Sequence, residues 1–171
     1  MHDLIVIGGN PGSGKTTISK LLEQQGFMRL GIDDMYLQAP RDPHIENWFE
    51  DRAFLDTAYA LLRADILRAL HENKRIAIET TGVSKRWTDL LTELKAKFGD
   101  QIITIYLETS SEISAKRIHD RNKTDYPIKM TEEKLDVFFK LGKDTSGAYQ
   151  HVIDANRPLT ETFSEIMSLL K

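Results

Sequence analysis

The feature that most constrains this chain is an apolar run followed at once by a glycine-rich loop and a helical segment. Leu4 to Ile7 is continuously apolar and ends at Gly8, which is typical of a buried strand. The segment from Thr16 to Gln25 is then predicted to be a helix. Buried strands that alternate with helices form parallel α/β sheets, so the rest of the chain should alternate in the same way.

The sequence does continue as alternating strand and helix candidates. The further strand candidates are residues 27–32, 76–78, 102–107 and 152–153. The further helix candidates are residues 53–73, a segment containing Trp87 to Phe98, a segment that begins at Thr109 and Glu112 as a capping box, and a last segment containing Phe163 to Leu170. We expect an α/β fold, a three-layer α/β/α sandwich with a five-stranded, mainly parallel sheet, in a single domain over residues 1–171. Ligands of such sheets bind at the C-terminal ends of the strands.

Composition excludes several classes of function. The net charge is −3, from 23 Lys and Arg against 26 Asp and Glu, so no broad basic surface exists and nucleic acid is an unlikely partner. The chain has no cysteine, which excludes disulfides and thiolate chemistry. The early apolar run is too short for a signal sequence or a membrane span. We therefore expect a cytoplasmic protein, as a monomer or homodimer, with no membrane partner.

The loop from Gly9 to Thr17 is the most specific signal in the sequence. It matches the pattern G-x-x-x-x-G-K-[ST] between a predicted strand and a predicted helix. The glycines let backbone N–H groups converge on a polyphosphate, and the helix N-terminus adds positive potential. We expect Lys15 to reach the β- and γ-phosphates, the Thr16 hydroxyl to bind Mg²⁺, and Thr17 to help hold the α-phosphate. The predicted nucleotide-binding residues of this loop are Gly9, Asn10, Pro11, Gly12, Ser13, Gly14, Lys15, Thr16 and Thr17.

Two short motifs raise the alternative of a GTP-binding switch. The segment from Glu79 to Gly82 resembles the D-x-x-G of GTPases, and the segment from Asn122 to Asp125 matches N-K-x-D. In GTPases N-K-x-D recognises guanine and follows a buried strand, but here it follows a polar, helix-like stretch, so we interpret the match as accidental. A nonenzymatic nucleotide-binding module is the second alternative.

Acidic residues at two strand ends fit a kinase better than a switch. Asp33 and Asp34 follow the second strand, where an acceptor hydroxyl must be oriented and deprotonated, although a surface turn would also explain them. Glu79 ends the third strand, where it could help hold Mg²⁺ or contact the substrate. Asp34 and Glu79 are thus candidate substrate-binding residues, and Thr16 and Glu79 are candidate metal ligands.

Two arginines spaced by four residues complete the predicted site. Arg117 and Arg121 share one face of a helix and could neutralise charge on the transferring phosphoryl group, although exposed arginines are often only solvated. The region of about 117–130 is predicted to be a lid. Tyr36, Trp48, Phe49 and Arg52 either bind the acceptor or pack the long helix, and packing is the favoured interpretation.

Taken together, these residues resemble the small P-loop kinases, closest to the chloramphenicol phosphotransferase, zeta-toxin and polynucleotide-kinase-like group. The resemblance implies the P-loop NTPase form of the three-layer α/β/α sandwich. The resemblance implies that Asp33 is the catalytic base, with Asp34 as second candidate, and that the lid arginine is Arg117 or Arg121. It also implies that adenine lies against the loop from Asp154 to Pro158, with Arg157 binding the nucleotide. The segment from Glu79 to Gly82 departs from the family, in which many members carry an Asp and a downstream Asn. The arginine and glycine set of a shikimate site is also missing.

The sequence therefore predicts an ATP-dependent kinase that uses Mg²⁺. Its partners would be ATP and a small-molecule or nucleotide-like acceptor, which the sequence does not identify. Lys15, Asp33, Arg117 and Arg121 are the predicted catalytic residues.

Overall fold

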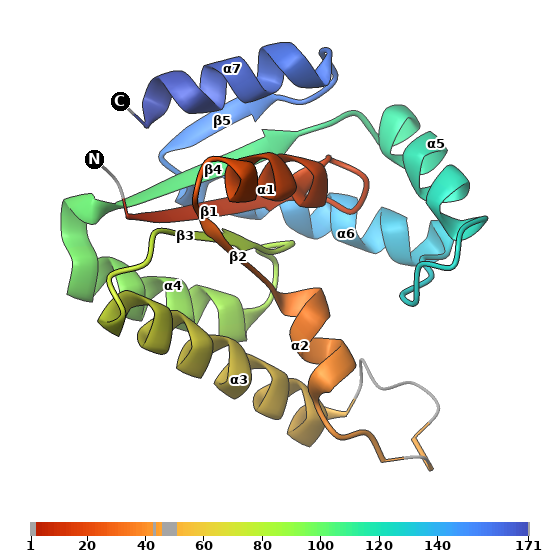
Figure 1. Cartoon of the computed structure of the whole chain (residues 1–171). Coiled ribbons are helices and arrows are strands. Elements are labelled where there is room, and N and C mark those ends of the chain that lie inside the picture. The colour runs from red at the N-terminus through yellow and green to blue at the C-terminus, as the bar shows by residue number, and fades with distance from the viewer. Residues whose placement is uncertain (1–2, 43, 46–50, 171) are drawn as a thin grey trace.

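The computed structural model describes residues 3–42, 44–45 and 51–170, and it shows one sheet with helices on both faces (Figure 1). The strand order is β2-β3-β1-β4-β5, and every neighbouring pair is parallel. The strands are β1 (Leu4–Gly9), β2 (Met28–Gly31), β3 (Ile76–Glu79), β4 (Ile102–Glu108) and β5 (His151–Asp154). This is the expected fold class, and the sheet is parallel throughout.

Alternation along β1 explains why both faces of the sheet are covered. Leu4 and Val6 belong to one apolar cluster, whereas Ile5 and Ile7 belong to the other. The second cluster is covered by α1 (Lys15–Gln24) and α7 (Leu159–Leu169), and Figure 1 shows α7 above the sheet. The first is covered by α3 (Arg52–His71) and α4 (Lys85–Phe98), below the sheet. The central strands are therefore buried on both sides, as their continuous apolar runs require.

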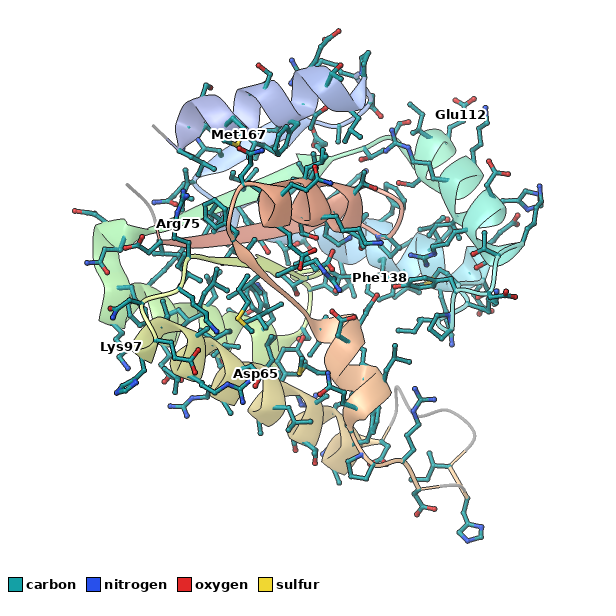
Figure 2. All side chains as sticks on the ribbon, in the orientation of Figure 1. Asp65, Arg75, Lys97, Glu112, Phe138 and Met167 are labelled. Atoms are coloured by element: carbon teal, nitrogen blue, oxygen red, sulfur yellow. The ribbon has the colours of Figure 1, made fainter. Side chains whose placement is uncertain are left out.

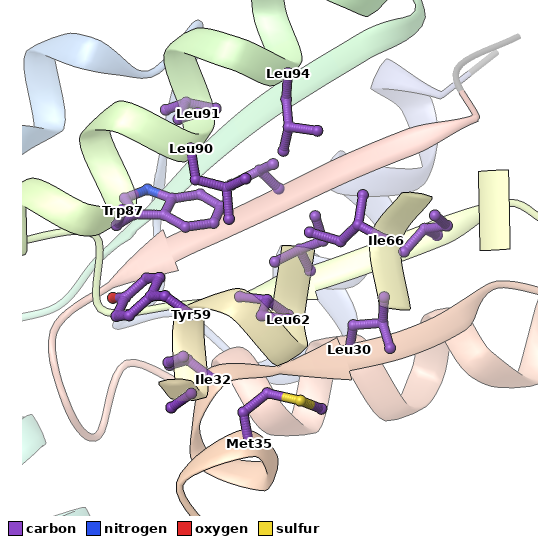
Figure 3. Close-up of a cluster of buried hydrophobic side chains, with 14 of the residues drawn as sticks. Leu30, Ile32, Met35, Tyr59, Leu62, Ile66, Trp87, Leu90, Leu91 and Leu94 are labelled. Atoms are coloured by element: carbon purple, nitrogen blue, oxygen red, sulfur yellow. The ribbon is translucent and has the colours of Figure 1, made fainter. Parts of the chain in front are cut away.

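The larger cluster joins α3 and α4 to residues 32–39 after β2. Figure 3 shows Trp87 of α4 and Tyr59 of α3 turned toward the same apolar interior, with Ile32 and Met35 nearby. Tyr59 is largely buried, and its hydroxyl lies 2.7 Å from the Ser84 hydroxyl. Ser84 also accepts a hydrogen bond from the Trp87 backbone N–H and so caps α4.

The remaining helices lie around the C-terminal ends of the strands (Figure 1). They are α2 (Ile32–Gln38), α5 (Ser111–Asn122) and α6 (Glu132–Thr145), and short 3₁₀ turns occupy Gly99–Gln101 and Ser146–Ala148. A third small cluster of Ile118, Met130 and Leu135 joins α5 to α6. Figure 2 shows Phe138 of α6 on the side of the molecule where α2 and α5 lie.

The strand predictions and all five helix predictions are confirmed, with shifts of one to three residues at some of their ends. Two helices, α2 and α6, were not predicted. The Thr109 capping box is wrong, because Ser110 is the N-cap of α5 and accepts from the Ile113 backbone N–H. Thr109 is buried instead, and its hydroxyl has no hydrogen-bond partner among the described residues.

Within the described ranges, none of the helices combines the length and apolar composition that crossing a membrane requires.

Candidate functional site

The glycine-rich loop turns sharply between β1 and α1 because its glycines adopt left-handed backbone conformations. Gly12 has φ +84°, and Gly14, the N-cap of α1, has φ +97°. A methyl group at Gly12 would lie 2.8 Å from the Ser114 carbonyl oxygen, so α5 approaches the loop too closely for any side chain there. Since Gly14 offers no side-chain cap, the first N–H groups of α1 remain directed at the loop, where an anion can accept from them.

Lys15 folds back over this loop. Its ammonium donates to the carbonyl oxygens of Gly9 and Asn10, each at 2.8 Å. Burial lowers the pKa of Lys15 to about 8, although the carboxylates of Asp33 and Glu79 act in the opposite direction. The nearby Arg121 guanidinium contributes to the lowering. Lys15 is thus buried close to two carboxylates and one guanidinium.

The other loop residues divide between the cavity and the interior. Pro11, Gly12, Gly14, Thr16 and Thr17 line a large cavity beside the loop. The Asn10 side chain is instead buried and lies 3.4 Å from the Tyr106 hydroxyl, while the Ser13 hydroxyl is buried with no partner in the described structure. Asn10 therefore acts on Lys15 through its carbonyl, and its side chain anchors the loop to the sheet. Gly9 likewise presents its carbonyl to Lys15.

The cavity has a volume of about 1040 Å³, which is sufficient for a nucleotide phosphate chain and a second small molecule. Five structural segments surround it: the loop with α1, α2, α3, the segment after β3, and the α5–α6 region. Lys15, Thr16, Asp33, Glu79, Arg117 and Arg121, all predicted from sequence, line it together. Asp34 is not part of this lining.

Asp33 faces the cavity from the first turn of α2 and already accepts a hydroxyl hydrogen bond. The donor is the Tyr126 phenol, at 2.8 Å from Oδ2. Burial, together with the charge of Asp33, raises the pKa of Tyr126, so this phenol stays protonated and neutral. Arg121 lies over the Tyr126 ring, with its guanidinium carbon 4.4 Å from the ring centroid.

Asp34 and Glu79 are joined by an arginine that the sequence analysis did not single out. Arg29 of β2 forms an ion pair with Asp34 at 2.9 Å and a second, closer ion pair with Glu79. In the β2–β3 register Gly31 lies opposite Glu79, and a methyl group at Gly31 would lie 3.0 Å from carboxylate oxygens of both acids. The missing side chain at Gly31 therefore leaves room for the three charges.

Arg117 joins the glycine-rich loop to the segment after β5. Its guanidinium donates to the Gly12 carbonyl and to the Ala155 carbonyl, both at 3.2 Å. It also lines a second cavity of about 210 Å³, which Thr17 and Arg157 share. Arg157 donates to the Asp154 carbonyl and forms an ion pair with Glu165, so its charge is already matched on the surface. This smaller cavity lies where the sequence places the adenine.

The donor set fits a magnesium ion that is held partly by phosphate oxygens. The Thr16 hydroxyl lines the large cavity, and Glu79 Oε2 is buried without a hydrogen-bond partner among the described residues. No group of three or more His, Cys, Asp or Glu side chains capable of holding a metal occurs in the described ranges. Magnesium sites that share substrate phosphates need only one or two protein ligands, so this composition is appropriate.

The residues considered as acceptor contacts differ in whether they line the cavity. Tyr36 lines the cavity and is also largely buried in the core, whereas Arg52 is exposed and outside the lining. Trp48 and Phe49 lie outside the described residues. Asn122 of the N-K-x-D match ends α5, and its side chain bonds to the Met130 backbone, so the motif follows a helix as its sequence context indicated.

Two site residues, Arg29 and Tyr126, were not predicted from the sequence. Arg29 stands out in retrospect as a charge inside an otherwise apolar strand candidate, and such a residue needs a buried partner. Tyr126 has no comparable signal, because only the folded chain places the turn after α5 against α2.

The parallel sheet of order 2-3-1-4-5, the glycine-rich loop and the lysine over it define a chain with the small P-loop kinase fold. The chain belongs to the family described as AAA domain (AAA_33), which matches residues 4–140. The matched range contains the whole glycine-rich loop and the strand-end acids.

One relative matches over nearly the whole chain, and solved structures show the same fold. The chain is similar to the UPF0200 protein PAE1629 of Pyrobaculum aerophilum, with 21% identity over 99% of this chain and 98% of that protein. It is similar in fold to a sugar kinase from Janibacter sp. HTCC2649, with a TM-score of 0.70, 16% identity, and coverage of 99% of this chain and 95% of the other. For a gluconokinase from Sinorhizobium meliloti 1021 the TM-score is 0.63 at 19% identity, with coverage of 98% and 94%.

Proposed function

We propose that this protein is an ATP-dependent phosphotransferase that moves the γ-phosphoryl group to a hydroxyl of a small molecule. One observation supports this more than any other. Lys15, which sits over the glycine-rich loop, and Asp33, which already accepts a hydroxyl hydrogen bond, line the same cavity. A phosphate-binding lysine and a carboxylate base on two sides of one space are what transfer to an alcohol needs.

The protein's residues would act as follows. The loop amides and Lys15 hold the phosphates, while the smaller cavity near Thr17 and Arg157 takes the base. Arg117 and Arg121 approach the phosphates from α5. Thr16 and Glu79 would hold Mg²⁺, which when bound offsets negative charge on the phosphate oxygens.

The transfer step balances without any other reactant. Asp33 takes the proton of the acceptor hydroxyl as the hydroxyl oxygen bonds to the γ-phosphorus, and the bond from that phosphorus to the β–γ bridging oxygen breaks. The products are ADP and a phosphate monoester. Asp34 is a weaker candidate for the base, because its carboxylate is paired with Arg29 and lies outside the cavity lining.

The first experiment separates binding from transfer. ADP release is measured across a library of hydroxyl compounds in the wild type, Asp33→Asn and Asp34→Asn, and Mg-ATP binding is measured by calorimetry in each. We expect Asp33→Asn to bind Mg-ATP normally and to lose at least a hundredfold in acceptor-stimulated turnover, of the order that a general base supplies. Asp34→Asn should retain transfer. The opposite pattern would move the base to Asp34, and equal activity in all three would remove the carboxylate mechanism.

The second experiment tests the phosphate site itself. Lys15→Ala should abolish the thermal stabilisation by Mg-ATP, whereas Lys97→Ala should not change it. Lys97 is an exposed lysine of α4, which Figure 2 shows at the other end of the molecule from α5. Guanine preference with slow hydrolysis and no acceptor effect would instead favour a GTP-binding switch. Binding without turnover on any acceptor would favour a nonenzymatic module.

A further inference from the structure

We call the part of the large cavity beyond Asp33 its acceptor end, and its lining is mostly uncharged. Beyond Asp33, its wall is built from α2, α3 and the segment after β3. Its side chains are apolar or carry neutral hydroxyls: Tyr36, Leu55, Tyr59, Thr81, Val83 and Ser84. Such a surface suits a ligand with an apolar face and a few hydroxyl groups.

The charges of the cavity are distributed unequally. Its basic side chains come from α1, α5 and α6, and they are Lys15, Lys20, Arg117, Arg121 and Lys134. The described wall from α2, α3 and the segment after β3 contributes no basic side chain, only the carboxylates of Asp33 and Glu79. Pro43 and the stretch 46–50 carry no Lys, Arg or His in their sequence. Lys15 and Arg121 lie near Asp33 itself, so an anionic group that extends from Asp33 along this wall would have no basic side chain of the described wall beside it.

Three arginines, which come from β2, the segment after α2, and α4, are engaged outside the cavity. Arg86 forms an ion pair with Asp56, and Arg41 lies 5.7 Å from the centre of the Phe54 ring. Neither lines the cavity. Arg29 lies behind Glu79, where its charge is matched by two carboxylates. Desolvating an anion at the acceptor end would thus go uncompensated.

The tyrosines of the wall are neutral hydrogen-bonding groups. Burial raises the pKa values of both Tyr36 and Tyr59, so neither phenol ionises near neutral pH. The Tyr59 hydroxyl is paired with that of Ser84 at 2.7 Å. These groups can donate to or accept from an alcohol, but they add no charge to the wall.

Tyr126 shows which kind of group fits against Asp33. Its phenol is a neutral hydroxyl carried on an aromatic ring, and it lies 2.8 Å from the carboxylate that would serve as the base. It occupies the position that an acceptor hydroxyl must reach for its proton to be taken. The site therefore already holds a ring alcohol from its own chain.

From these observations we infer that the acceptor is an uncharged hydroxyl compound with an apolar or aromatic ring, and not a carboxylate or a phosphate ester. The inference deepens the proposed kinase function and rests on it for the role of Asp33. The distribution of charge and apolar surface around the cavity carries the rest.

A matched pair of ligands tests this inference directly. Styrene glycol and mandelate share a phenyl ring and a neighbouring hydroxyl, and they differ in that mandelate carries a carboxylate where the glycol has a hydroxymethyl group. Their affinities for the protein saturated with Mg-ADP are measured by saturation-transfer NMR titration. We expect styrene glycol to bind at least about tenfold more tightly, which corresponds to about 1.4 kcal/mol. Equal affinities, tighter binding of mandelate, or no binding of either at millimolar concentration would overturn the inference.

A charge placed in the wall gives a second test. Val83 lines the acceptor end and is only partly buried, so Val83→Lys adds a cation there, while Val83→Met changes size without charge. Val83→Lys should reverse the preference in favour of mandelate, and Val83→Met should keep the preference for the glycol. An unchanged preference in Val83→Lys would show that the probes bind elsewhere and would count against the inference.

The two proposals fail differently. If Mg-ATP does not bind, or binds equally well to Lys15→Ala, the kinase function fails whatever the ligand pair shows. If Mg-ATP binds and depends on Lys15 but mandelate is preferred, only the acceptor inference fails.

Discussion

Nucleotide binding is expected to weaken as the pH rises above 8, and Lys15 determines the size of the effect. Without a ligand, burial lowers the pKa of Lys15 to about 8, so about half of the molecules carry a neutral lysine at that pH. A bound triphosphate favours the ammonium form and raises this pKa again. Each nucleotide bound at pH 8 should therefore take up about half a proton.

The change in affinity follows from the same titration. Because binding takes up a proton, affinity falls as the pH rises through the pKa of the free protein. From pH 7 to 8 the association constant should fall about twofold, and from pH 8 to 9 about fivefold. Phosphate groups lose their last proton near pH 6, so the nucleotide itself contributes little over this interval.

Calorimetry measures both quantities. Titrations of Mg-ATP in two buffers with different ionisation enthalpies give the protons taken up, and a series of pH values gives the affinity. Lys15→Arg remains charged throughout and should lose the pH dependence even where it binds more weakly, whereas Lys97→Ala should retain it. Wild-type affinity that is constant from pH 7 to 9, with no proton uptake, would refute the reasoning.

Three further substitutions test the supporting structure. Arg29→Met leaves the carboxylate of Glu79 buried without its partner, so it should lower the free energy of unfolding by about 3 kcal/mol in urea denaturation. Adding Glu79→Gln to Arg29→Met should recover part of that loss. Gly12→Ala places a side chain on a backbone with φ +84° and against the Ser114 carbonyl, so it should lower the free energy of unfolding by about 1–3 kcal/mol. It should also abolish Mg-ATP binding in calorimetry, and normal binding would contradict the loop geometry. Ser84→Ala removes the N-cap of α4 and the partner of the Tyr59 hydroxyl and should cost about 1–2 kcal/mol in the same urea assay, while an unchanged midpoint would show that the cap contributes nothing.

The sheet and the glycine-rich loop were predictable because their signals are local. The run from Leu4 to Ile7 is continuously apolar because β1 is the central strand and is covered on both faces. The loop pattern encodes its own backbone conformation through Gly12 and Gly14. Both features depend only on residues close together in the sequence.

The two helices that were not predicted, α2 and α6, differ in whether the sequence contains a local signal for them. Asp33 and Asp34 were interpreted as the polar end of a strand, but they form the first turn of α2, where acidic residues interact favourably with the helix dipole. For α6 a signal existed: Thr131 caps the helix, acidic residues follow it, and apolar Leu135 and Phe138 lie three residues apart.

The electrostatic arrangement of the site could not be predicted from the sequence. The contact between Arg29 and Glu79 depends on the register of β2 with β3, which joins residues 50 positions apart. The bond from Tyr126 to Asp33 depends on where the turn after α5 lies relative to α2, 93 positions away. These tertiary contacts distinguish Asp33, which faces the cavity, from Asp34, which is paired with Arg29.

The central claim is that the backbone amides before α1 hold a triphosphate, and a titration of the ¹⁵N-labelled protein with Mg-ATP tests it most directly. We expect the largest chemical-shift changes on the amides of residues 12–17, with a smaller group in the segment 154–157 after β5, and we expect Lys15→Ala to remove both. Changes confined to other parts of the molecule, or the same changes in Lys15→Ala, would contradict it.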